Sequence, residues 1–579
     1  MVDNIAQENF SFLSPLVQKK TTFKELDLRW GKTNYSVYLS DEEIESISIK
    51  FNSIINFYHK VLNDKLDWWF SPVSARNNFG SPLFHHFLCF QICLKLVEEK
   101  TIPSKCITDS DAVYNGLLKL KNSEQWDGYI IHSRQRSRVQ MLIKMIKSFS
   151  RVICHTIYPY LLIKFTFKKT KYSSNIKSLI DTFVLPGNEY SDRYYSGISD
   201  FLSKKEISKI RFVPTFSGYR LRDYFFSIRK LRYRSDKFLF KEDFLTFSDI
   251  FYSLLHALRL LNLSIPSVKI VNFDLSAQLK EELRRFGGLE DGVHGFINYN
   301  FAKRLRSKGV KIKTVVDWFE NHGRDRGWNY GFHRFHQNIN TLGYNMVFLS
   351  KWHLAFSPLP LERENEVLPK KILTPCRKLI EFIKKNDPMI NVKTTGSFRF
   401  PIPKTRFPSK ELLSILVPLS FKSDAATNSV KNVRNMFREI SKCSNLDFLI
   451  RFKPHPAILM SQVAELKNYA FNTNEIWTTK PLCDELQTAN IVLGEWTFSL
   501  LEALNAGIPV GVIRSTDGLF HSSIPYGAAE SLTFDIDSLN SLKKLIKIAQ
   551  TIESSELHSK GILLEPPSRF LAQEALGLL

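Results

Sequence analysis

The sequence predicts an α/β protein with two Rossmann-like, doubly wound parallel-sheet domains that face each other across a cleft, with helical insertions in the first domain. Three observations support this prediction. Short apolar segments alternate with helical patterns, a Pro-rich stretch covers residues 371–410, and a second series of apolar segments follows it. Strands that alternate with helices are typical of parallel sheets. We therefore divide the 579 residues into an N-terminal domain at 1–370, a linker at 371–410 and a C-terminal domain at 411–579.

The first domain is expected to begin with helices. Ser40 and the three acids after it are typical of a helix start, and an amphipathic pattern continues to about Leu62. An apolar run at Leu83–Val97 predicts a second helix. Strands are then expected at Lys105–Thr108, Leu179–Leu185, Ile210–Pro214, Val268–Phe273, Lys311–Phe319 and Met346–Leu349. The wide spacing between the early strands indicates basic or helical insertions at about 122–176 and 201–241.

The linker and the second domain follow. Inside the linker, Thr374–Lys385 is expected to be a helix with Thr374 as its cap. After it, the apolar segments ILVPLS, RFKPHP, IVLG and PVGVI predict the strands of a second sheet. Two α/β domains joined by a linker form a cleft, where small ligands commonly bind.

The chain is strongly basic, with a net charge of +23. Residues 201–241 hold twelve Lys and Arg and three acids, interleaved with Phe and Tyr. Such a surface attracts acidic glycans, sugar nucleotides, anionic lipid headgroups or nucleic acid. The seven cysteines form no CxxC pair, which fits a reducing compartment. The apolar run Val152–Phe167 is too short to span a bilayer, so any membrane contact is expected to be peripheral.

The most informative stretch lies at residues 449–513. A short strand leads into Lys453-Pro-His455-Pro, whose prolines stop both strand and helix. A second strand ends at Gly494, and Thr497 and Ser499 come where a helix begins, with Glu502 on its first turns. Strand, glycine turn, helix and strand form a βαβ unit. Free N–H groups at such a helix start favour a bound phosphate.

This stretch resembles the donor-binding half of GT-B glycosyltransferases, in particular bacterial enzymes that build capsule, O-antigen, lipopolysaccharide and teichoic-acid-type polymers. The matching residues are His455-Pro456, Thr497, Ser499, Glu502-Ala503, and Gly507, Pro509 and Val510. The resemblance implies that Lys453, His455, Thr497, Ser499 and Glu502 bind the phosphate and ribose of a nucleotide-activated sugar.

A second motif lies in the first domain, at Gly287–Gly295. Glu290 and Asp291 are adjacent there, so like-charge repulsion is expected to raise the pKa of one of them toward that of a useful base. An acidic pair before a glycine also resembles the motif of bacterial sialyl- and polysialyltransferases, which likewise carry a His-Pro motif. Asp291 is therefore one candidate base, with Glu290 an acceptor-side candidate. A plain surface turn before a helix is the other interpretation.

A third cluster follows the strand at 311–319. Glu320, His322, Arg324 and Arg326 crowd the carboxyl end of this strand, which is the ligand edge of an open α/β sheet. Glu320 is a second candidate base. The other three are candidates to hold an acceptor or a phosphate.

Together these observations predict a glycosyltransferase that moves a sugar from a nucleotide-activated donor to a surface polysaccharide or lipopolysaccharide acceptor. A CMP-linked donor is favoured, no cofactor or metal is expected, and the place of action is the cytoplasm, with peripheral contact to an anionic inner membrane. Glycan or lipid-linked glycan is the expected acceptor, and nucleic acid is not an expected partner. Two alternatives remain: a CDP-polyol phosphotransferase of teichoic-acid type, and a non-enzymatic basic protein that binds nucleic acid or a membrane surface.

Overall fold

The computed structural model describes most of the chain. It describes residues 25–551 and 564–579, except for residues 79, 134–137, 168–175, 188, 191–194, 196, 235, 271–272, 286–287, 347–349, 401–405, 410, 421–422, 444, 456–473, 496, 514–523 and 526–529. Side chains 138–142, 144, 269–270, 273 and 423–424 are also outside the description.

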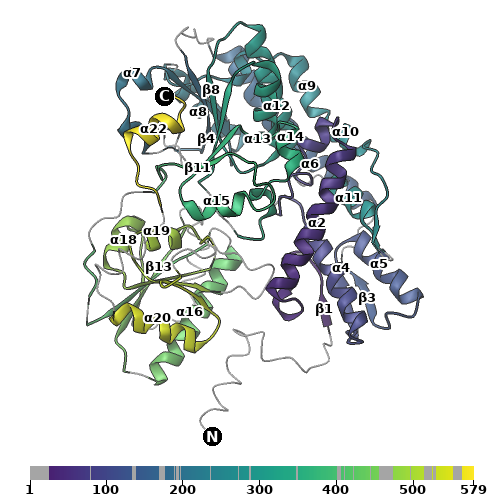
Figure 1. Ribbon diagram of the computed structural model, residues 1–579, viewed down its shortest axis with the longest axis vertical. Helices are drawn as coiled ribbons and strands as arrows, with labels where there is room; N and C mark the ends of the chain where they lie inside the picture. The colour runs from purple at the N-terminus through teal and green to yellow at the C-terminus, as the bar shows by residue number, and fades with distance from the viewer. Residues whose placement is uncertain are drawn as a thin grey trace.

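A small α/β unit precedes the two large sheets (Figure 1). Its parallel strands are β1 (Glu25–Asp27), β2 (Lys105–Thr108) and β3 (Tyr129–His132), and its helices are α2 (Asp41–Val61), α4 (Leu83–Glu98) and α5 (Asp111–Asn122). The expected helix starts are confirmed: Ser40 caps α2 by accepting a hydrogen bond from the Glu43 backbone N–H, and Glu43 accepts one in return. The predicted strand 105–108 is also confirmed. It pairs with β1 and β3 rather than with the first large sheet.

The first large sheet has six parallel strands in the order β11-β10-β9-β8-β4-β5. They are β4 (Ser178–Val184), β5 (Ile210–Phe216), β8 (Thr314–Trp318), β9 (Asn340–Tyr344), β10 (Lys371–Thr374) and β11 (Val392–Thr394). The chain lays down β4 and β5, then returns to the other side of β4 with β8. The order reverses between β4 and β8, and this reversal defines a doubly wound sheet.

The second large sheet repeats this plan with the order β14-β13-β12-β15-β16-β17. Its strands are β12 (Leu413–Pro418), β13 (Phe448–Lys453), β14 (Glu475–Trp477), β15 (Ile491–Gly494), β16 (Val510–Ile513) and β17 (Thr533–Ile536). All neighbours pair in parallel, and helices α16 (Ser423–Cys443), α18 (Leu482–Thr488), α19 (Ser499–Asn505) and α20 (Leu539–Thr551) accompany them. The order reverses between β12 and β15. Two doubly wound parallel domains in one chain are the GT-B arrangement that the sequence predicted.

Several predicted boundaries need correction. Residues 371–374 and 392–394, assigned to the linker, form β10 and β11, because the prolines of this stretch flank these strands instead of interrupting them. Segment 201–241, expected as an insertion, contains the predicted strand 210–214, which is confirmed as the edge strand β5, and also the helices α7 (Lys204–Ile207) and α8 (Leu221–Tyr233). The other expected insertion, 122–176, holds β3, α6 (Arg138–Leu161) and the π-helix η3 (Leu162–Thr166).

Three further element predictions were wrong or displaced. Segment 268–273 forms a small antiparallel pair, β6 (Lys269–Ile270) with β7 (Phe273–Asp274), outside the large sheets. Strand β9 lies just before the predicted strand 346–349, of which 347–349 lie outside the described residues. The helix predicted from Thr374 begins later, as α15 (Arg377–Ile383), since Thr374 still pairs with Thr394 in the sheet.

The chain ends against the first domain. Helix α22 (Arg569–Ala575) leaves the second domain and packs beside β4, with Ala572, Ala575 and Leu576 buried in the same cluster as Ile180 and Leu342 (Figure 1). The two domains are thus tied twice along the chain, once by the segment after β11 and once by α22.

Glycines fix the spacing of two helices in the first domain. α12 (Leu289–Ser307) and α13 (Gly323–Phe335) pack backbone to backbone, because Gly327 lies against Gly295. A Cβ atom added at Gly327 would lie 2.0 Å from the Gly295 carbonyl oxygen, so no other residue fits at this spacing. The close approach also brings the N-terminal ends of both helices together, which positions the site described next.

Candidate active site

The loop after β8 lies at the point where the first sheet reverses its strand order. In open α/β sheets, ligands bind in the crevice at the carboxyl ends of the strands beside this point. β8 is buried along its whole length, and Phe319, Glu320, Asn321 and His322 follow it before α13 begins. The Asp325 carboxylate accepts hydrogen bonds from the backbone N–H groups of Glu320 (2.9 Å) and His322 (3.0 Å). These two bonds hold the loop in one conformation.

Asn321 gives the loop a second anchor. Its φ is +59°, a left-handed conformation that few residues other than glycine adopt. Its amide donates to the Ala355 carbonyl (2.8 Å) and accepts from Arg326 Nε (2.9 Å), and the residue is fully buried. The strained backbone between the partly buried residues Glu320 and His322 is therefore held by a buried side chain.

Four of the predicted residues come together here, and we call them the cavity cluster: Asp291, Glu320, His322 and Arg324. His322 lies between the two acids, with Nδ1 3.9 Å from Asp291 Oδ2 and Nε2 3.7 Å from Glu320 Oε2. Arg324 Nε donates to Asp291 Oδ1 at 2.7 Å. The two sequence motifs that offered alternative bases thus belong to one constellation.

The pKa of Asp291 departs from the expectation. Burial alone would raise it, but the Arg324 guanidinium and His322 reverse this effect and hold the pKa below its ordinary value. The predicted rise by repulsion from Glu290 is wrong for Asp291, because Glu290 is exposed at the start of α12 while Arg324 is in direct contact. Asp291 is therefore ionised at neutral pH, and the contact with Arg324 makes it a weaker base than an unpaired carboxylate.

Asp291 and Arg324 line a cavity of about 410 Å³. Its other walls come from α6, from the turn after β5 and from the start of α8 and α12, with lining residues Ser148, Arg151, Val152, His155, Phe216, Ser217, Gly218, Tyr219, Tyr224, Gly288, Leu289 and Glu290. This size lies in the range of small-molecule sites. The mixture of hydroxyl, guanidinium, imidazole and carboxylate groups around two tyrosines suits a polyhydroxylated ligand.

The cavity walls were largely missed by sequence reasoning. Tyr219 and Tyr224 belong to the basic and aromatic segment that had been noted only for its charge, and Arg151 and His155 belong to a presumed insertion. His155 Nδ1 and the Tyr224 hydroxyl are 3.1 Å apart, so α6 and α8 are joined at the cavity wall. No local motif marks these residues, because they meet only through folding.

Arg326, predicted to hold an acceptor or phosphate, does neither in this structure. Its side chain is fully buried and lies 2.6 Å from Glu362 Oε1, which also pairs with Arg76 at 3.3 Å. We call Arg76, Asn321, Arg326 and Glu362 the buried cluster. Burial would raise the pKa of Glu362, but Arg326 and Arg76 together hold it far below its ordinary value. Arg326 is therefore a structural residue.

The predicted donor residues share the carboxyl-end edge of the second sheet. Lys453 ends β13 and donates from Nζ to the Lys480 carbonyl at 2.6 Å, and His455 follows two residues later. Thr497 and Ser499 come after β15, beside the strand-order reversal. Thr497 Oγ1 accepts from the Ser499 backbone N–H at 3.3 Å and so shapes the start of the seven-residue helix α19. Pro456, the second half of the His-Pro motif, lies outside the described residues.

Helix α19 lies at the contact between the two domains (Figure 1). Its Leu501 is buried in one cluster with Phe319, the residue just before Glu320, and Phe498 packs against the same cluster. The Arg399 guanidinium stacks on the Phe498 ring at 4.8 Å. The loop that carries Glu320 and His322 is therefore joined through Phe319 to the helix that carries Glu502.

Glu502 has an unusual ionisation. Burial raises its pKa to about 7, and the positive charge of Arg399 opposes that rise only in part. Near neutral pH a large fraction of this carboxyl group is protonated and can donate a hydrogen bond. Such a group can serve a ribose hydroxyl as donor or as acceptor.

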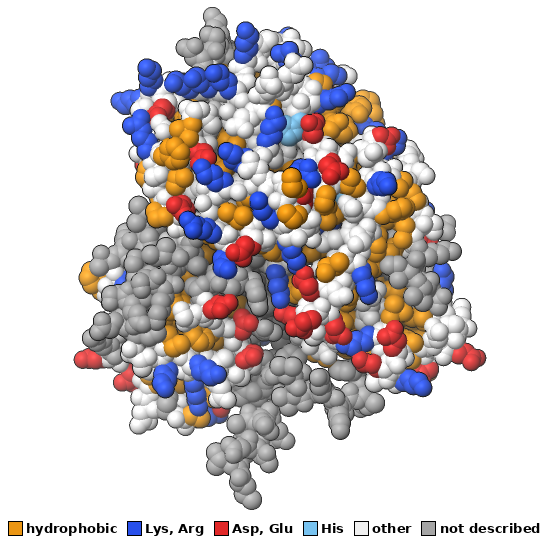
Figure 2. Space-filling view, in the orientation of Figure 1, with side chains coloured by type: hydrophobic (Ala, Val, Ile, Leu, Met, Phe, Trp, Pro, Cys, Tyr) orange, Lys and Arg blue, Asp and Glu red, His pale blue; other side chains and the backbone are white. Residues whose placement is uncertain are grey.

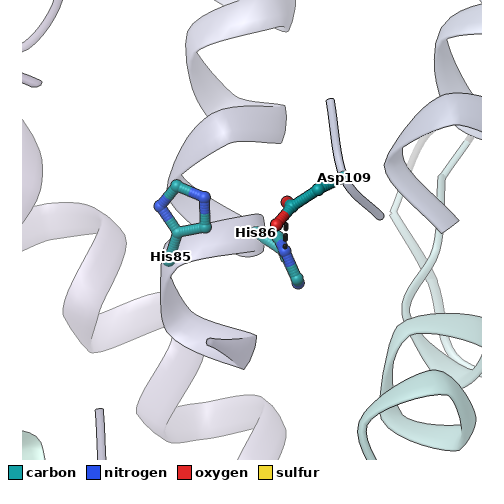
Figure 3. A group of neighbouring side chains, drawn as sticks. All are labelled: His85, His86 and Asp109. Atoms are coloured by element: carbon teal, nitrogen blue, oxygen red, sulfur yellow. Dashed lines mark ion pairs between the residues drawn. The ribbon is translucent and has the colours of Figure 1, made fainter. Parts of the chain in front are cut away.

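One group of described side chains has the composition of a metal site: His85, His86 and Asp109, all buried (Figure 3). Asp109-Ser-Asp111, an Asp-x-Asp triplet, directly follows β2. However, His85 Nε2 lies 3.0 Å from the Leu28 carbonyl and Nδ1 contacts the Tyr35 hydroxyl. A cation would have to replace one of these His85 bonds, while His86 Nε2 and Asp109 Oδ1 lie 3.6 Å apart as an ion pair.

In the same N-terminal unit, a carboxylate of the protein binds the free N–H groups at the start of a helix. The Glu281 carboxylate accepts hydrogen bonds from the backbone N–H groups of Asp111 (3.2 Å) and Ala112 (2.9 Å) at the start of α5. A phosphate would bind at this position in a nucleotide-binding βα unit. In the small N-terminal unit, the Glu281 carboxylate thus occupies the position where a phosphate would bind.

Comparison with known proteins adds the following. No protein-family model and no curated protein matches the sequence. Among solved structures, a UDP-GlcNAc 2-epimerase from Neisseria meningitidis bound to UDP-GlcNAc is 12% identical over 69% of this chain and 97% of that chain, with a TM-score of 0.36. The N-terminal domain of a Candida albicans trehalose-6-phosphate phosphatase is 11% identical over 69% and 97%, with a TM-score of 0.40. The calicheamicin glycosyltransferase CalG4 is 11% identical over 69% and 95%, with a TM-score of 0.38. At these TM-scores, the strand order described above defines the fold rather than these similarities.

Proposed function

We propose that the chain is a glycosyltransferase that moves a sugar from a nucleotide-activated donor to a glycan acceptor bound in the 410 Å³ cavity. The observation that carries this proposal is Asp291: an ionised carboxylate that lines the cavity, is fixed by Arg324 and contacts His322. A fixed carboxylate at a polar cavity is suited to deprotonate a bound hydroxyl group.

The transfer step uses few protein groups. Asp291 takes the proton of the acceptor hydroxyl, and the oxygen forms a bond to the anomeric carbon of the donor sugar. The bond from that carbon to the phosphate oxygen breaks, and the nucleotide leaves with the electron pair. Lys453 and His455 supply positive charge to the leaving phosphate, while Glu320 holds His322 against Asp291. We propose that no metal is needed for this charge balance.

The finer assignment concerns donor and acceptor. A CMP-linked sugar is the proposed donor, and the proposed acceptor is a surface polysaccharide or lipopolysaccharide assembled in the cytoplasm. The resemblance of His455-Pro456 and Glu290-Asp291-Gly292 to sialyl- and polysialyltransferase motifs supports this choice.

A thermal-shift screen of the full chain against CMP-, CDP-, UDP-, GDP- and dTDP-sugars tests the donor. A ligand that binds only the folded chain stabilises it by about 2.7 kcal/mol at a hundredfold excess over its dissociation constant. We expect the CMP-sugar to give the largest shift, and His455→Ala and Glu502→Ala to abolish it. If both variants keep the full shift, the donor residues are assigned wrongly.

Product formation by Asp291→Asn tests the base. Loss of a general base lowers the turnover by about 10²–10⁴-fold, while the donor-induced shift should remain, because Asp291 is on the acceptor side. Glu364→Gln is the control: it neutralises a carboxylate that is 52% exposed and lies outside the cavity lining, so it should keep the rate. A phosphodiester product would replace this proposal by a polyol phosphotransferase, and equal rates for both variants would remove Asp291 from catalysis.

A further inference from the structure

The positive charge of the chain is concentrated in one part of the first domain. Residues 134–241 contain 24 Lys and Arg but only seven Asp and Glu, which accounts for most of the net charge of +23. Figure 2 shows Lys and Arg side chains gathered over the end of this domain that carries α7 and α8. This end is remote from the second domain (Figure 1). Arg151 is the one described Lys or Arg of this segment that lines the 410 Å³ cavity. The proposed active site therefore gives no role to the rest of this positive charge.

Helix α8 presents a stripe of alternating basic and aromatic side chains on its exposed side. Arg222, Phe226, Arg229 and Tyr233 follow one another at helical spacing and are all exposed, with Phe226 at 64% and Tyr233 at 74%. The opposite side is the buried one and holds Tyr224, Ile228 and Leu231. The helix therefore has a normal core face, and its second, outer face combines cations with large apolar rings.

The π-helix η3 extends this stripe. Phe165 is 77% exposed, and Phe167 packs on Phe225 with ring centroids 5.7 Å apart, while Phe225 contacts Phe226 at 5.6 Å. The two elements are also held together by Arg232, whose guanidinium donates to the Ile163 carbonyl at 3.4 Å. We call the set Phe165, Phe167, Phe225, Phe226 and Tyr233 the aromatic patch.

The residues of this surface fit an anionic bilayer better than they fit nucleic acid. An anionic bilayer attracts the cations at long range and accepts rings and aliphatic groups at the boundary between headgroups and acyl chains. Nucleic acid also binds cations and aromatic rings, but it does so in grooves that follow the backbone. The aromatic patch lies on the outer face of a helix rather than in a groove. The exposed aliphatic residues Ile143, Ile146 and Leu221 on α6 and α8 cannot stack on bases.

We propose that the exposed face of α8 and η3 docks on the surface of an anionic lipid bilayer. Among the described helices, none is both long and apolar enough to cross a bilayer, so this contact is a surface contact. Arg and Lys of α8 bind the headgroups, and the rings of the aromatic patch enter the headgroup boundary. α6 and α8 also form walls of the 410 Å³ cavity, so an acceptor anchored in the same bilayer would be presented beside it. This last consequence rests on the proposed function, but the docking itself does not.

Vesicle co-sedimentation of the full chain tests the docking without any sugar donor. The probes are vesicles of phosphatidylcholine alone and vesicles with 30% phosphatidylglycerol. We expect binding to the anionic vesicles only, weakened by salt because the attraction is screened. Phe165→Glu combined with Phe226→Glu should weaken this binding by about tenfold or more, since two rings leave the boundary and two negative charges replace them.

Phe407→Glu is the matched control, because Phe407 is 70% exposed and lies outside segment 134–241. It should bind vesicles like the unchanged chain, and circular dichroism should show that all variants fold. Equal binding of the double variant and the control would overturn the proposal. Steeply salt-dependent binding to a single-stranded oligonucleotide, with no vesicle binding, would overturn it in favour of nucleic acid. Either result leaves the donor screen and the Asp291→Asn assay unaffected.

Discussion

Arg324 and Arg326 belong to the same helix turn, yet they serve different clusters. Arg324 is 12% exposed, lines the cavity and holds Asp291. Arg326 has no exposed surface and holds Glu362, Asn321 and the Ser74 hydroxyl. The sequence shows both as charged residues after a strand, in the motif Gly-Arg-Asp-Arg-Gly. Only the packing separates a residue that lines the cavity from one that supports the loop.

The comparison shows how the site is supported. The buried cluster holds Asn321 in its strained conformation, and Asn321 lies between Glu320 and His322 of the cavity cluster. Neutral His59 adds to this support: it accepts from Trp68 Nε1 at Nδ1 (3.0 Å), so its Nε2 carries the proton and lies 3.5 Å from Glu362. Burial lowers the pKa of His59 to about 4, which keeps it neutral. The buried cluster therefore supports the loop, and the cavity cluster holds the residues to which the proposed function assigns activity.

The largest effect is expected for Glu362→Gln. The change leaves two buried guanidinium ions without their common carboxylate, and removal of one partner of a buried ion pair costs about 3–5 kcal/mol. Chemical denaturation should show this loss in the free energy of unfolding. Glu364→Gln on the same helix, α14 (Pro360–Glu364), is the control, because its side chain is 52% exposed and should matter by less than about 1 kcal/mol. Similar values for the two variants would mean that the buried cluster does not support the fold.

Glu502 can be compared with Glu362, because it is a half-buried carboxyl group near one arginine, Arg399, whereas Glu362 pairs with two. Its pKa is raised from 4.5 to about 7. Below pH 4.5 the carboxyl is protonated in both the folded and the unfolded chain and costs nothing. Between pH 4.5 and about 7 the unfolded chain ionises this group while the folded chain keeps it protonated, so stability falls across this window and is level above it.

Glu502→Gln should therefore stabilise the chain by about 1–3 kcal/mol at pH 8 and by much less near pH 5. Thermal and urea unfolding of both proteins at the two pH values measure the difference. A variant that is less stable than the unchanged chain at pH 8 would show that the Glu502 carboxylate is ionised and well paired in the fold.

Much of the fold could be predicted because it depends on local patterns. Buried parallel strands such as β12 and β15 are mostly apolar in sequence. The start of α2 is marked by the capping pair Ser40 and Glu43. The errors concern short strands. β10 and β11 have four and three residues in a Pro-rich region, and β9 contains Gly343, so none of them shows a strong pattern. Their place in the sheet comes from pairing with distant neighbours, which no local signal encodes.

The site was predictable in part for the same reason. Asp291, Glu320, His322 and Arg324 could be named because each lies at a strand end or a helix start. Their meeting depends on the glycine contact between α12 and α13, and a Gly295–Gly327 pairing cannot be read from two isolated glycines. The depressed pKa of Asp291 likewise depends on Arg324, 33 positions away in the chain. Glu290, its neighbour in sequence, is exposed and makes no such contact.

The smallest effect on stability is expected for Arg324→Lys. This variant tests the contrast between the cavity cluster and the buried cluster most directly. The pair with Asp291 borders the cavity, so water can solvate both partners, and the free energy of unfolding should change by less than about 1 kcal/mol. Arg326→Lys should cost more, because a single ammonium group cannot replace the fork that reaches Glu362, Asn321 and Ser74 at once. Denaturation of both variants measures the difference. If Arg324→Lys is the more destabilising change, the cavity cluster supports the fold, and Asp291 is held by Arg324 for stability rather than for the transfer of a proton.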